Sequence, residues 1–246
     1  MTAPPNLSIV IPAYNEEQRL PPTLSAIRAY LDGSDDQSNA EILVVDDGSR
    51  DGTADLVESV AKQDPRVRLV RNPGNHGKGY SVRHGMLKAR GEWILFSDAD
   101  LSAPIEELPK LLNAARKQKA QVAIGSRALD RSLVGVHQSA LREFAGRLLN
   151  RVMRLITGLK FMDTQCGFKL FHRDAAQLIF ARQQLDSFTF DVEDLFIARQ
   201  LGIPSIEVPV RWNNVEGTKV GVLVGPRFFL DLLLIHWYRL AGKYRR

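Results

Sequence analysis

The sequence has one cysteine, Cys166, and no apolar run of membrane-spanning length. A single thiol excludes an intrachain disulfide and a zinc site built from cysteines, and it is typical of a reducing compartment. The stretch that comes closest to a spanning helix, residues 228–238, is shorter than the roughly 20 residues required, and Asp231 interrupts it. The first residues lack the basic and apolar segments of a signal peptide, so we expect none.

The excess of positive charge is small, with 33 Lys and Arg against 28 Asp and Glu and a formal net charge of +5. A surface of this charge tolerates anionic partners, but it does not distinguish nucleic acid, anionic lipid and a phosphorylated substrate. At 246 residues the chain is long enough for one sizeable domain with a buried core.

The first hundred residues alternate between short β-branched runs and helical segments. The predicted strands are 7–12, 41–45, 67–70 and 93–96, and the predicted helices are 21–31, 53–63 and 79–89. This alternation is typical of a doubly wound α/β fold, with a mostly parallel central sheet and helices on both faces. In such sheets ligands bind at the carboxyl ends of the strands.

Two carboxylates one residue apart, Asp98 and Asp100, directly follow the apolar strand 93–96. A carboxylate taken out of water must be paired or must coordinate a metal, and oxygen ligands suit Mg²⁺ or Mn²⁺. Such a cation is a natural partner for a diphosphate. The alternative is an acidic loop that caps a helix beginning near Pro104.

Three further polar motifs also follow predicted strands. They are Pro12-Ala13-Tyr14-Asn15-Glu16, Asp46-Asp47-Gly48-Ser49 and Asn75-His76-Gly77-Lys78-Gly79. Tyr14 can stack on a base, Asp47 can accept hydrogen bonds from a base or ribose, and Lys78 adds charge at a glycine-flanked helix start that suits a phosphate. Each motif alone is also compatible with an ordinary cap or turn. Four of them at one sheet edge predict a nucleotide-diphosphate site, and no P-loop motif is present.

These motifs, in this order, resemble those of family 2 glycosyltransferases, which have the GT-A fold. The matching segments are 11–16, 45–53, 75–79 and 98–101. Within the family the chain is similar to polyprenyl-phosphate sugar synthases, most closely to the dolichyl-phosphate β-glucosyltransferase branch and also to dolichyl-phosphate mannose synthases. The closer likeness lies in three segments, 163–171, 190–193 and 215–219. With them the resemblance extends across nearly the whole chain.

The resemblance implies an inverting, metal-dependent transfer of a sugar to a polyprenyl or dolichyl phosphate, with Mg²⁺ or Mn²⁺ as cofactor. Glucose from UDP-glucose is the first expectation, and the product would be a β-linked lipid-phosphate sugar. Two alternatives stay open, a mannosyltransferase that uses GDP-mannose and a soluble glycosyltransferase that acts on a glycan hydroxyl.

The resemblance also implies roles for individual residues. The nucleotide-binding residues would be Pro12, Ala13, Tyr14, Glu16, Asp47, Lys78 and Asp98, and the metal ligands Asp98 and Asp100. The catalytic residues would be Asp100, Arg127, Arg142, Gln165, Glu193 and Asp194. Arg127, Arg142 and Lys219 would bind the acceptor phosphate. Ser102 stands where the mannosyl branch has a further metal ligand, a Gln, which favours the glucosyl branch.

The acceptor decides whether a general base is needed. A phosphate monoester, with a second pKa near about 6, is mostly dianionic at neutral pH and is already nucleophilic. Arginine suits its binding because guanidinium pairs bidentately with phosphate and stays charged. A hydroxyl acceptor would instead need Glu193 or Asp194 as a base, although both are also compatible with ordinary acidic residues at a helix start.

Two segments have the pattern of basic amphipathic helices, residues 140–158 and 222–246. Such helices can lie on an anionic membrane surface or pack on the domain itself. We expect a catalytic domain at 1–221, which includes the 140–158 helix on the acceptor side, and a C-terminal basic helix at 222–246. We also expect peripheral association with the cytoplasmic face of a membrane. A nucleic-acid partner is disfavoured because the Asp-x-Asp motif repels polyphosphate and the basic residues lack interleaved aromatic residues.

Overall fold

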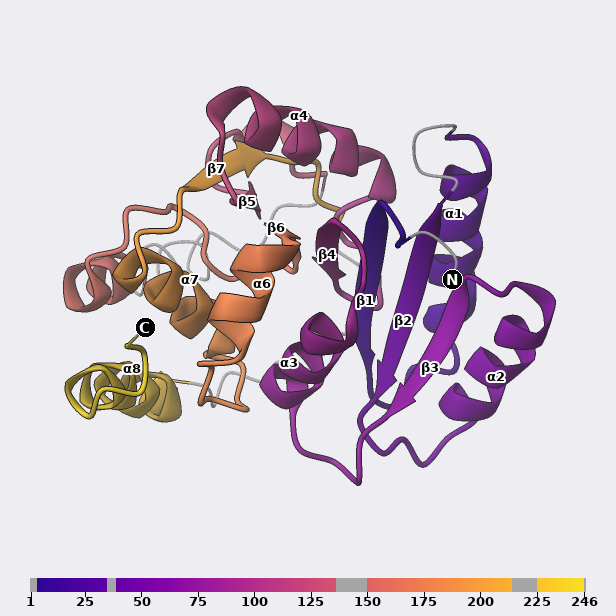
Figure 1. Cartoon of the computed structure of the whole chain (residues 1–246), viewed down its shortest axis with the longest axis horizontal. Coiled ribbons are helices and arrows are strands. Elements are labelled where there is room, and N and C mark those ends of the chain that lie inside the picture. Colours follow the sequence, from indigo (N-terminus) through magenta and orange to yellow (C-terminus); the bar gives the residue numbers. More distant parts are fainter. Residues whose placement is uncertain (1–3, 35–38, 136–149, 214–224, 246) are drawn as a thin grey trace.

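The computed structural model describes residues 4–34, 39–135, 150–213 and 225–245. They form a seven-stranded sheet of order β3-β2-β1-β4-β6-β5-β7 (Figure 1). The strands are β1 (Leu7–Ala13), β2 (Ala40–Asp46), β3 (Val67–Arg71), β4 (Trp93–Ser97), β5 (Val122–Ser126), β6 (Phe168–His172) and β7 (Ser205–Pro209). All neighbours pair in parallel except β6, which is antiparallel to both β4 and β5.

The helices cover both faces of the sheet (Figure 1). They are α1 (Leu20–Asp32), α2 (Thr53–Gln63), α3 (Lys78–Lys88), α4 (Leu108–Gln118), α6 (Arg173–Phe180), α7 (Phe190–Gln200) and α8 (Gly225–Leu240), with short 3-10 turns η2 (Ile105–Glu107) and η3 (Arg131–Leu133). Residues 150–157 are also helical. Side chains of α3, α6, α7 and α8 share one core cluster, and those of α1, α2 and α4 share the other.

Strand periodicity explains the two clusters. Val10 and Leu43 point into one cluster while Ile9 and Ile42 point into the other, as alternate residues of a strand must. Every residue of β1, β2 and β4 is buried, which is typical of central strands covered on both faces. The four predicted strands and the three predicted helices are confirmed, each within a residue or so of its predicted ends.

Because β1, β2 and β4 are parallel, the loops that follow them meet at one edge of the sheet. Two of these loops are tied together through Asn15, which has a left-handed φ of 52°. Its backbone N–H donates to Oγ of Ser49 (2.9 Å), and its Oδ1 accepts from the backbone N–H of Arg50 (2.8 Å). These two hydrogen bonds fix the loops that follow β1 and β2 relative to each other.

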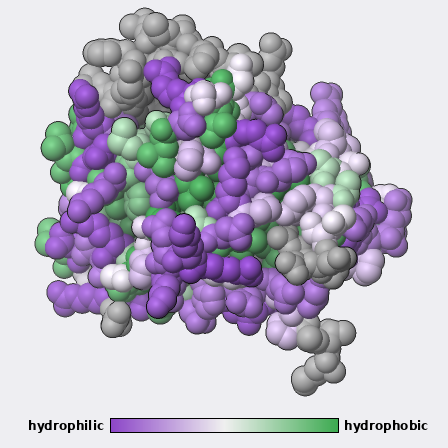
Figure 2. Space-filling model, turned by 90° about the horizontal axis from the view of Figure 1, so that it is seen from above, coloured by the Kyte–Doolittle hydropathy of each residue, from purple (hydrophilic) through white to green (hydrophobic). Residues whose placement is uncertain are grey.

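The C-terminal helix α8 packs on the helical layer that contains α7. Phe228, Leu232 and Ile235 of α8 are buried in the same cluster as the α7 side chains. Of the predicted helices at 140–158 and 222–246, residues 150–157 and 225–240 are helical, whereas residues 158 and 241–245 are not. Residues 140–149, 222–224 and 246 lie outside the described residues. No described helix is both long and apolar enough to cross a membrane. In the view of Figure 2, hydrophobic side chains gather toward the side that holds the C-terminal half of the chain.

Gly85 of α3 packs tightly against side chains of β1 and β2. A Cβ there would lie 2.4 Å from Cγ1 of Val10 and 2.7 Å from Cγ2 of Val45. We expect Gly85→Ala to lower the free energy of unfolding by about 1 to 2 kcal/mol, because overpacking outweighs the helix propensity that alanine adds. Gly33→Ala is the control, since its Cβ would have no neighbour nearer than 3.6 Å. Equal urea unfolding curves for the two variants would contradict the prediction.

Candidate active site

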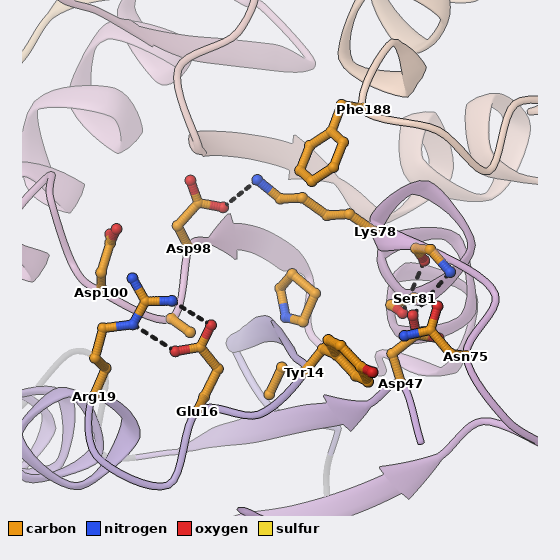
Figure 3. Close-up of a pocket in the computed structure, with 14 residues that line it drawn as sticks. Tyr14, Glu16, Arg19, Asp47, Asn75, Lys78, Ser81, Asp98, Asp100 and Phe188 are labelled. Atoms are coloured by element: carbon orange, nitrogen blue, oxygen red, sulfur yellow. Dashed lines mark hydrogen bonds and ion pairs between the residues drawn. The ribbon is translucent and has the colours of Figure 1, made fainter. Parts of the chain in front are cut away.

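A cavity of about 430 Å³ opens at the carboxyl edge of the sheet (Figure 3). Its lining includes all seven residues predicted to bind a nucleotide, together with the second carboxylate of the Asp-x-Asp motif: Pro12, Ala13, Tyr14, Glu16, Asp47, Lys78, Asp98 and Asp100. The structure therefore brings these residues together, and their individual roles stay predictions. Arg19, Ser81 and Phe188 also line the cavity and were not predicted.

Asp47 holds the loop that forms one wall of the cavity. Its buried carboxylate accepts hydrogen bonds from Nδ2 of Asn72 (2.8 Å) and from the backbone N–H groups of His76 (3.0 Å) and Gly77 (2.8 Å). Gly77 has a φ of 102°, and a Cβ there would lie 2.6 Å from the carbonyl oxygen of Asp186. This glycine lets α3 begin at the cavity, where the helix N-terminus favours an anion.

Lys78, the first residue of α3, reaches across the cavity to Asp98. Its Nζ lies 2.7 Å from Oδ1 of Asp98, and 5.8 Å from the ring centre of Phe188, which lies beside the lysine side chain (Figure 3). Burial opposes the positive charge, but the Asp98 and Asp191 carboxylates outweigh it and raise the pKa of Lys78. The lysine therefore stays charged in the cavity.

The two carboxylates of the Asp-x-Asp motif are oxygen donors of the kind that suits a divalent cation. Asp100 sits in a tight turn, with Leu101 at a left-handed φ of 46° and the Ser102 N–H donating to Oδ1 of Asp100 (3.0 Å). Oδ1 of Asp98 is buried, and it lies 2.7 Å from Nζ of Lys78. In the described part of the chain no three His, Cys, Asp or Glu side chains gather as a complete ligand set. One or two carboxylates completed by substrate phosphates and water is the usual protein contribution to Mg²⁺ sites.

Arg19 and Glu16 line the cavity and form an ion pair with each other. The Arg19 Nε donates to Oε2 of Glu16 (2.7 Å), and the backbone N–H of Glu16 donates to Oγ1 of Thr53 (2.8 Å). The hydrogen bond with Glu16 raises the pKa of Arg19. The position of Arg19, three residues beyond Glu16 at the start of a predicted helix, is the sequence signal that could have identified it.

A buried ion pair joins β6 to α7 beside the cavity. Nζ of Lys169 contacts Oδ1 of Asp191 and donates to the carbonyl oxygen of Cys166 (2.7 Å). Burial raises the pKa of Asp191 against the opposing effect of Lys169 and Lys78. A lysine inside the apolar run of β6 was the available signal, because a buried ammonium requires a partner. Cys166 is itself buried, which raises the pKa of its thiol to about 12.

The predicted residues Arg127 and Gln165 lie outside the cavity lining. Arg127 is bound to Asp163, with Nε 2.6 Å from Oδ2 and its second nitrogen 2.8 Å from Oδ1, and it lies over the Trp212 ring. Gln165 is exposed, and its backbone N–H donates to Asp163. Arg142 and Lys219 lie outside the described residues.

The acidic pair on α7 also lies away from the cavity lining. The Glu193 carboxylate accepts from the backbone N–H groups of Gln184 (2.9 Å) and Leu185 (2.8 Å) and from the Tyr244 hydroxyl (2.6 Å). Glu193 thus ties α7 to the C-terminal segment. Asp194 is buried, and burial together with Glu193 raises its pKa well above the ordinary range. The catalytic roles of Glu193 and Asp194 stay predictions.

The pair of Arg127 and Asp163 gives a pH-dependent prediction. Burial alone would raise the pKa of Asp163, but Arg127 outweighs it and the pKa is lowered, so the pair stabilises the fold at neutral pH and this contribution is lost in acid. Arg127→Met leaves a buried carboxylate without its cation. We expect the free energy of unfolding at neutral pH to fall by about 2 to 4 kcal/mol. The loss is smaller than for a fully buried pair because Arg127 is itself partly exposed.

In this variant the Arg127 charge no longer opposes burial, which raises the pKa of Asp163, so the loss should shrink as the pH falls toward about 4. Urea unfolding at both pH values measures it. Arg71→Met is the control, because Arg71 and Glu58 form a half-exposed ion pair that should contribute less than about 1 kcal/mol. A loss of the same size at both pH values would show that the ion pair is not its cause.

The family described as glycosyl transferase family 2 matches residues 8–180 of the chain. A dolichyl-phosphate β-glucosyltransferase of Trichomonas vaginalis is 38% identical over 243 residues, which cover 95% of this chain and 74% of that protein. The dolichyl-phosphate β-glucosyltransferase of Homo sapiens is 36% identical over 251 residues, which cover 97% of this chain and 77% of the human protein.

Solved structures with the same fold include glucosyl-3-phosphoglycerate synthase of Mycobacterium tuberculosis. Its complex with Mn²⁺, UDP and glucosyl-3-phosphoglycerate has a TM-score of 0.67 at 20% identity, covering 94% of this chain and 80% of that one. Its complex with Mn²⁺, UDP-glucose and phosphoglyceric acid has a TM-score of 0.67 at 19% identity, covering 94% and 79%. At this identity the likeness shows the fold, and the predicted GT-A fold is confirmed.

Proposed function

The chain belongs to glycosyltransferase family 2, and from that premise we propose that it transfers glucose from UDP-glucose to a polyprenyl or dolichyl phosphate. The observation that carries the proposal is the cavity that joins Tyr14, Lys78 and the Asp-x-Asp carboxylates at one sheet edge. Tyr14 suits the aromatic base, Lys78 suits the diphosphate, and the two carboxylates suit a divalent cation. The relatives named dolichyl-phosphate β-glucosyltransferase support the sugar and the acceptor class.

In this proposal the donor lies along the cavity. Tyr14 would stack on the base, the start of α3 with Lys78 would face the diphosphate, and Asp98 and Asp100 would hold Mg²⁺ or Mn²⁺. The bound cation supplies charge neutralisation of the departing UDP. The related mycobacterial structure with Mn²⁺ and UDP-glucose supports the choice of cation and donor.

The proposed reaction inverts the anomeric centre. An oxygen of the acceptor phosphate forms a bond to C1 of the glucose, and the bond between C1 and the UDP oxygen breaks, so that an α-linked donor gives a β-linked lipid phosphate. The acceptor dianion has no proton to lose, and a general base is not required. Neither candidate base, Glu193 or Asp194, lines the cavity, and three hydrogen-bond donors already occupy the Glu193 carboxylate, which favours this acceptor over a hydroxyl.

The residues that bind the acceptor phosphate and the sugar are also part of the proposal. Arg127, Arg142 and Lys219 are the proposed phosphate ligands, and Gln165 is the proposed polar contact to the sugar. Because the acceptor carries a long isoprenoid chain, we place the reaction at a membrane surface. We propose its cytoplasmic face, which agrees with the single unpaired cysteine of the chain.

Transfer of label from UDP-glucose into an organic-soluble product tests the proposal. With a short polyprenyl phosphate as acceptor we expect transfer that EDTA abolishes and Mn²⁺ or Mg²⁺ restores. Asp100→Ala should lower kcat/KM at least about a hundredfold, because the charge on the leaving UDP loses its counterion. Asp55→Ala on the exposed start of α2 is the matched control and should have full activity.

The same assay separates the alternatives. Transfer from GDP-mannose and none from UDP-glucose would replace the proposed donor. Metal-dependent binding of UDP without any lipid product would overturn the lipid acceptor and favour a hydroxyl acceptor.

The stacking role of Tyr14 has its own test. We expect Tyr14→Ala to weaken UDP binding about 5- to 150-fold, the range that base stacking on an aromatic side chain typically contributes. Tyr14→Phe keeps the ring and should keep most of the affinity. Titration calorimetry with Mn²⁺ measures both variants. Equal weakening in the two would assign the effect to the hydroxyl group instead of the ring.

A further inference from the structure

Helix α8 is apolar on two opposite sides. Its inner side packs into the core, where Phe228, Leu232 and Ile235 are at most 3% exposed. Its outer side carries six large hydrophobic side chains that are 39–80% exposed: Phe229, Leu230, Leu233, Leu234, Trp237 and Leu240. These six recur at intervals of three and four residues, so they form a continuous stripe, called here the outer face of α8.

This face is unusual for the molecule. Twelve large hydrophobic side chains are exposed in the described part of the chain, and six of them lie on this one helix. Scattered exposed hydrophobic residues are normal, but a contiguous apolar patch marks an interaction site. Because the inner side is fixed on the domain, only the outer face is available, and a flat apolar partner would meet the helix along its length.

The charges around the outer face of α8 indicate which kind of partner it binds. Arg227, Arg239 and Lys243 are exposed at its two ends, and Arg245 is exposed just beyond. The one acidic residue of α8, Asp231, is buried on the other side. An apolar stripe with cationic ends complements the acyl region and headgroups of an anionic bilayer, and Trp237 suits the interface between them. Two copies of the chain, packed symmetrically, would instead bring the same cations together.

We propose that the outer face of α8 is the surface by which the protein docks on a bilayer that contains anionic lipids, with the helix parallel to the membrane plane. The inference rests on the proposed function, because a lipid-linked acceptor phosphate is presented at such a surface.

The contacts of α8 connect this surface to the donor cavity. The Asp231 carboxylate accepts hydrogen bonds from Oγ of Ser187 (2.7 Å) and from Oγ1 of Thr189 (2.7 Å). Phe188 lies between these two residues and lines the cavity, with its ring centre 5.8 Å from Nζ of Lys78. A bilayer on the outer face is thus held in a fixed position relative to the cavity wall.

Sedimentation of the full chain with vesicles tests the surface. We expect the wild type to bind vesicles of phosphatidylcholine mixed with phosphatidylglycerol. Leu233→Ser combined with Trp237→Ser should weaken binding at least about tenfold, since two apolar side chains no longer enter the bilayer. Arg239→Glu combined with Lys243→Glu should weaken it at least about tenfold and remove the preference for phosphatidylglycerol.

Two controls match these variants. Leu87→Ser changes a leucine of α3 that is 37% exposed, and Arg116→Glu with Lys117→Glu reverses two exposed charges on α4, which packs on the opposite face of the sheet. Both should bind vesicles like the wild type. Since all altered residues are exposed, thermal unfolding should be the same for every variant.

Failure of wild-type binding, or unchanged binding by Leu233→Ser with Trp237→Ser, would overturn the proposal. So would a dimer in light scattering that this double variant dissociates, because a second copy would then cover the face. Glucosyl transfer to a short, water-soluble polyprenyl phosphate tests the proposed function separately from the docking surface. The α8 variants should keep that activity and lose transfer to vesicle-borne acceptor. A wild type that binds vesicles but transfers nothing in either assay would refute the proposed function and leave the docking surface standing.

Discussion

The position of the Asp98 carboxylate, at the end of a fully buried strand, constrains the rest of the cavity. The Asp98 side chain is partly exposed, but its Oδ1 is buried, and a buried carboxylate oxygen must be compensated by a nearby cation or by hydrogen bonds. Lys78 supplies the cation from the first turn of α3. Gly167 supplies the space, since a Cβ there would lie 2.0 Å from Oδ2 of Asp98. The start of a helix and the start of a strand must therefore both lie against this one side chain.

The direction of β6 places the start of this strand against the Asp98 side chain. Because β6 is antiparallel to β4, its first residue, Phe168, pairs with the last residue of β4, Ser97. A parallel strand would have ended at this edge and placed the segment before it at the opposite edge. The reversed strand also places Lys169 beside Phe96, within contact of Asp191 on α7. The second half of the chain thus completes a site that the first hundred residues begin.

The sequence predicts the first half well for a physical reason. Buried parallel strands and amphipathic helices have distinct periods, and the motifs after each strand identify the edge at which they meet. The second half is less predictable because long-range partners decide it. Arg127 is bound to a carboxylate 36 residues away, and Glu193 to a tyrosine 51 residues away. A resemblance names such residues, but local sequence does not reveal which side chain each one contacts.

Burial of the only cysteine has a practical consequence for experiments. Cys166 lies in the core beneath the Asp-x-Asp motif, and with a thiol pKa of about 12 it remains protonated across the physiological range. Alkylating reagents require an accessible thiolate, which this residue does not offer. A cysteine introduced anywhere on the surface would then be the sole reactive one. Fluorescent or spin labels can accordingly be attached at chosen positions without first replacing a native residue.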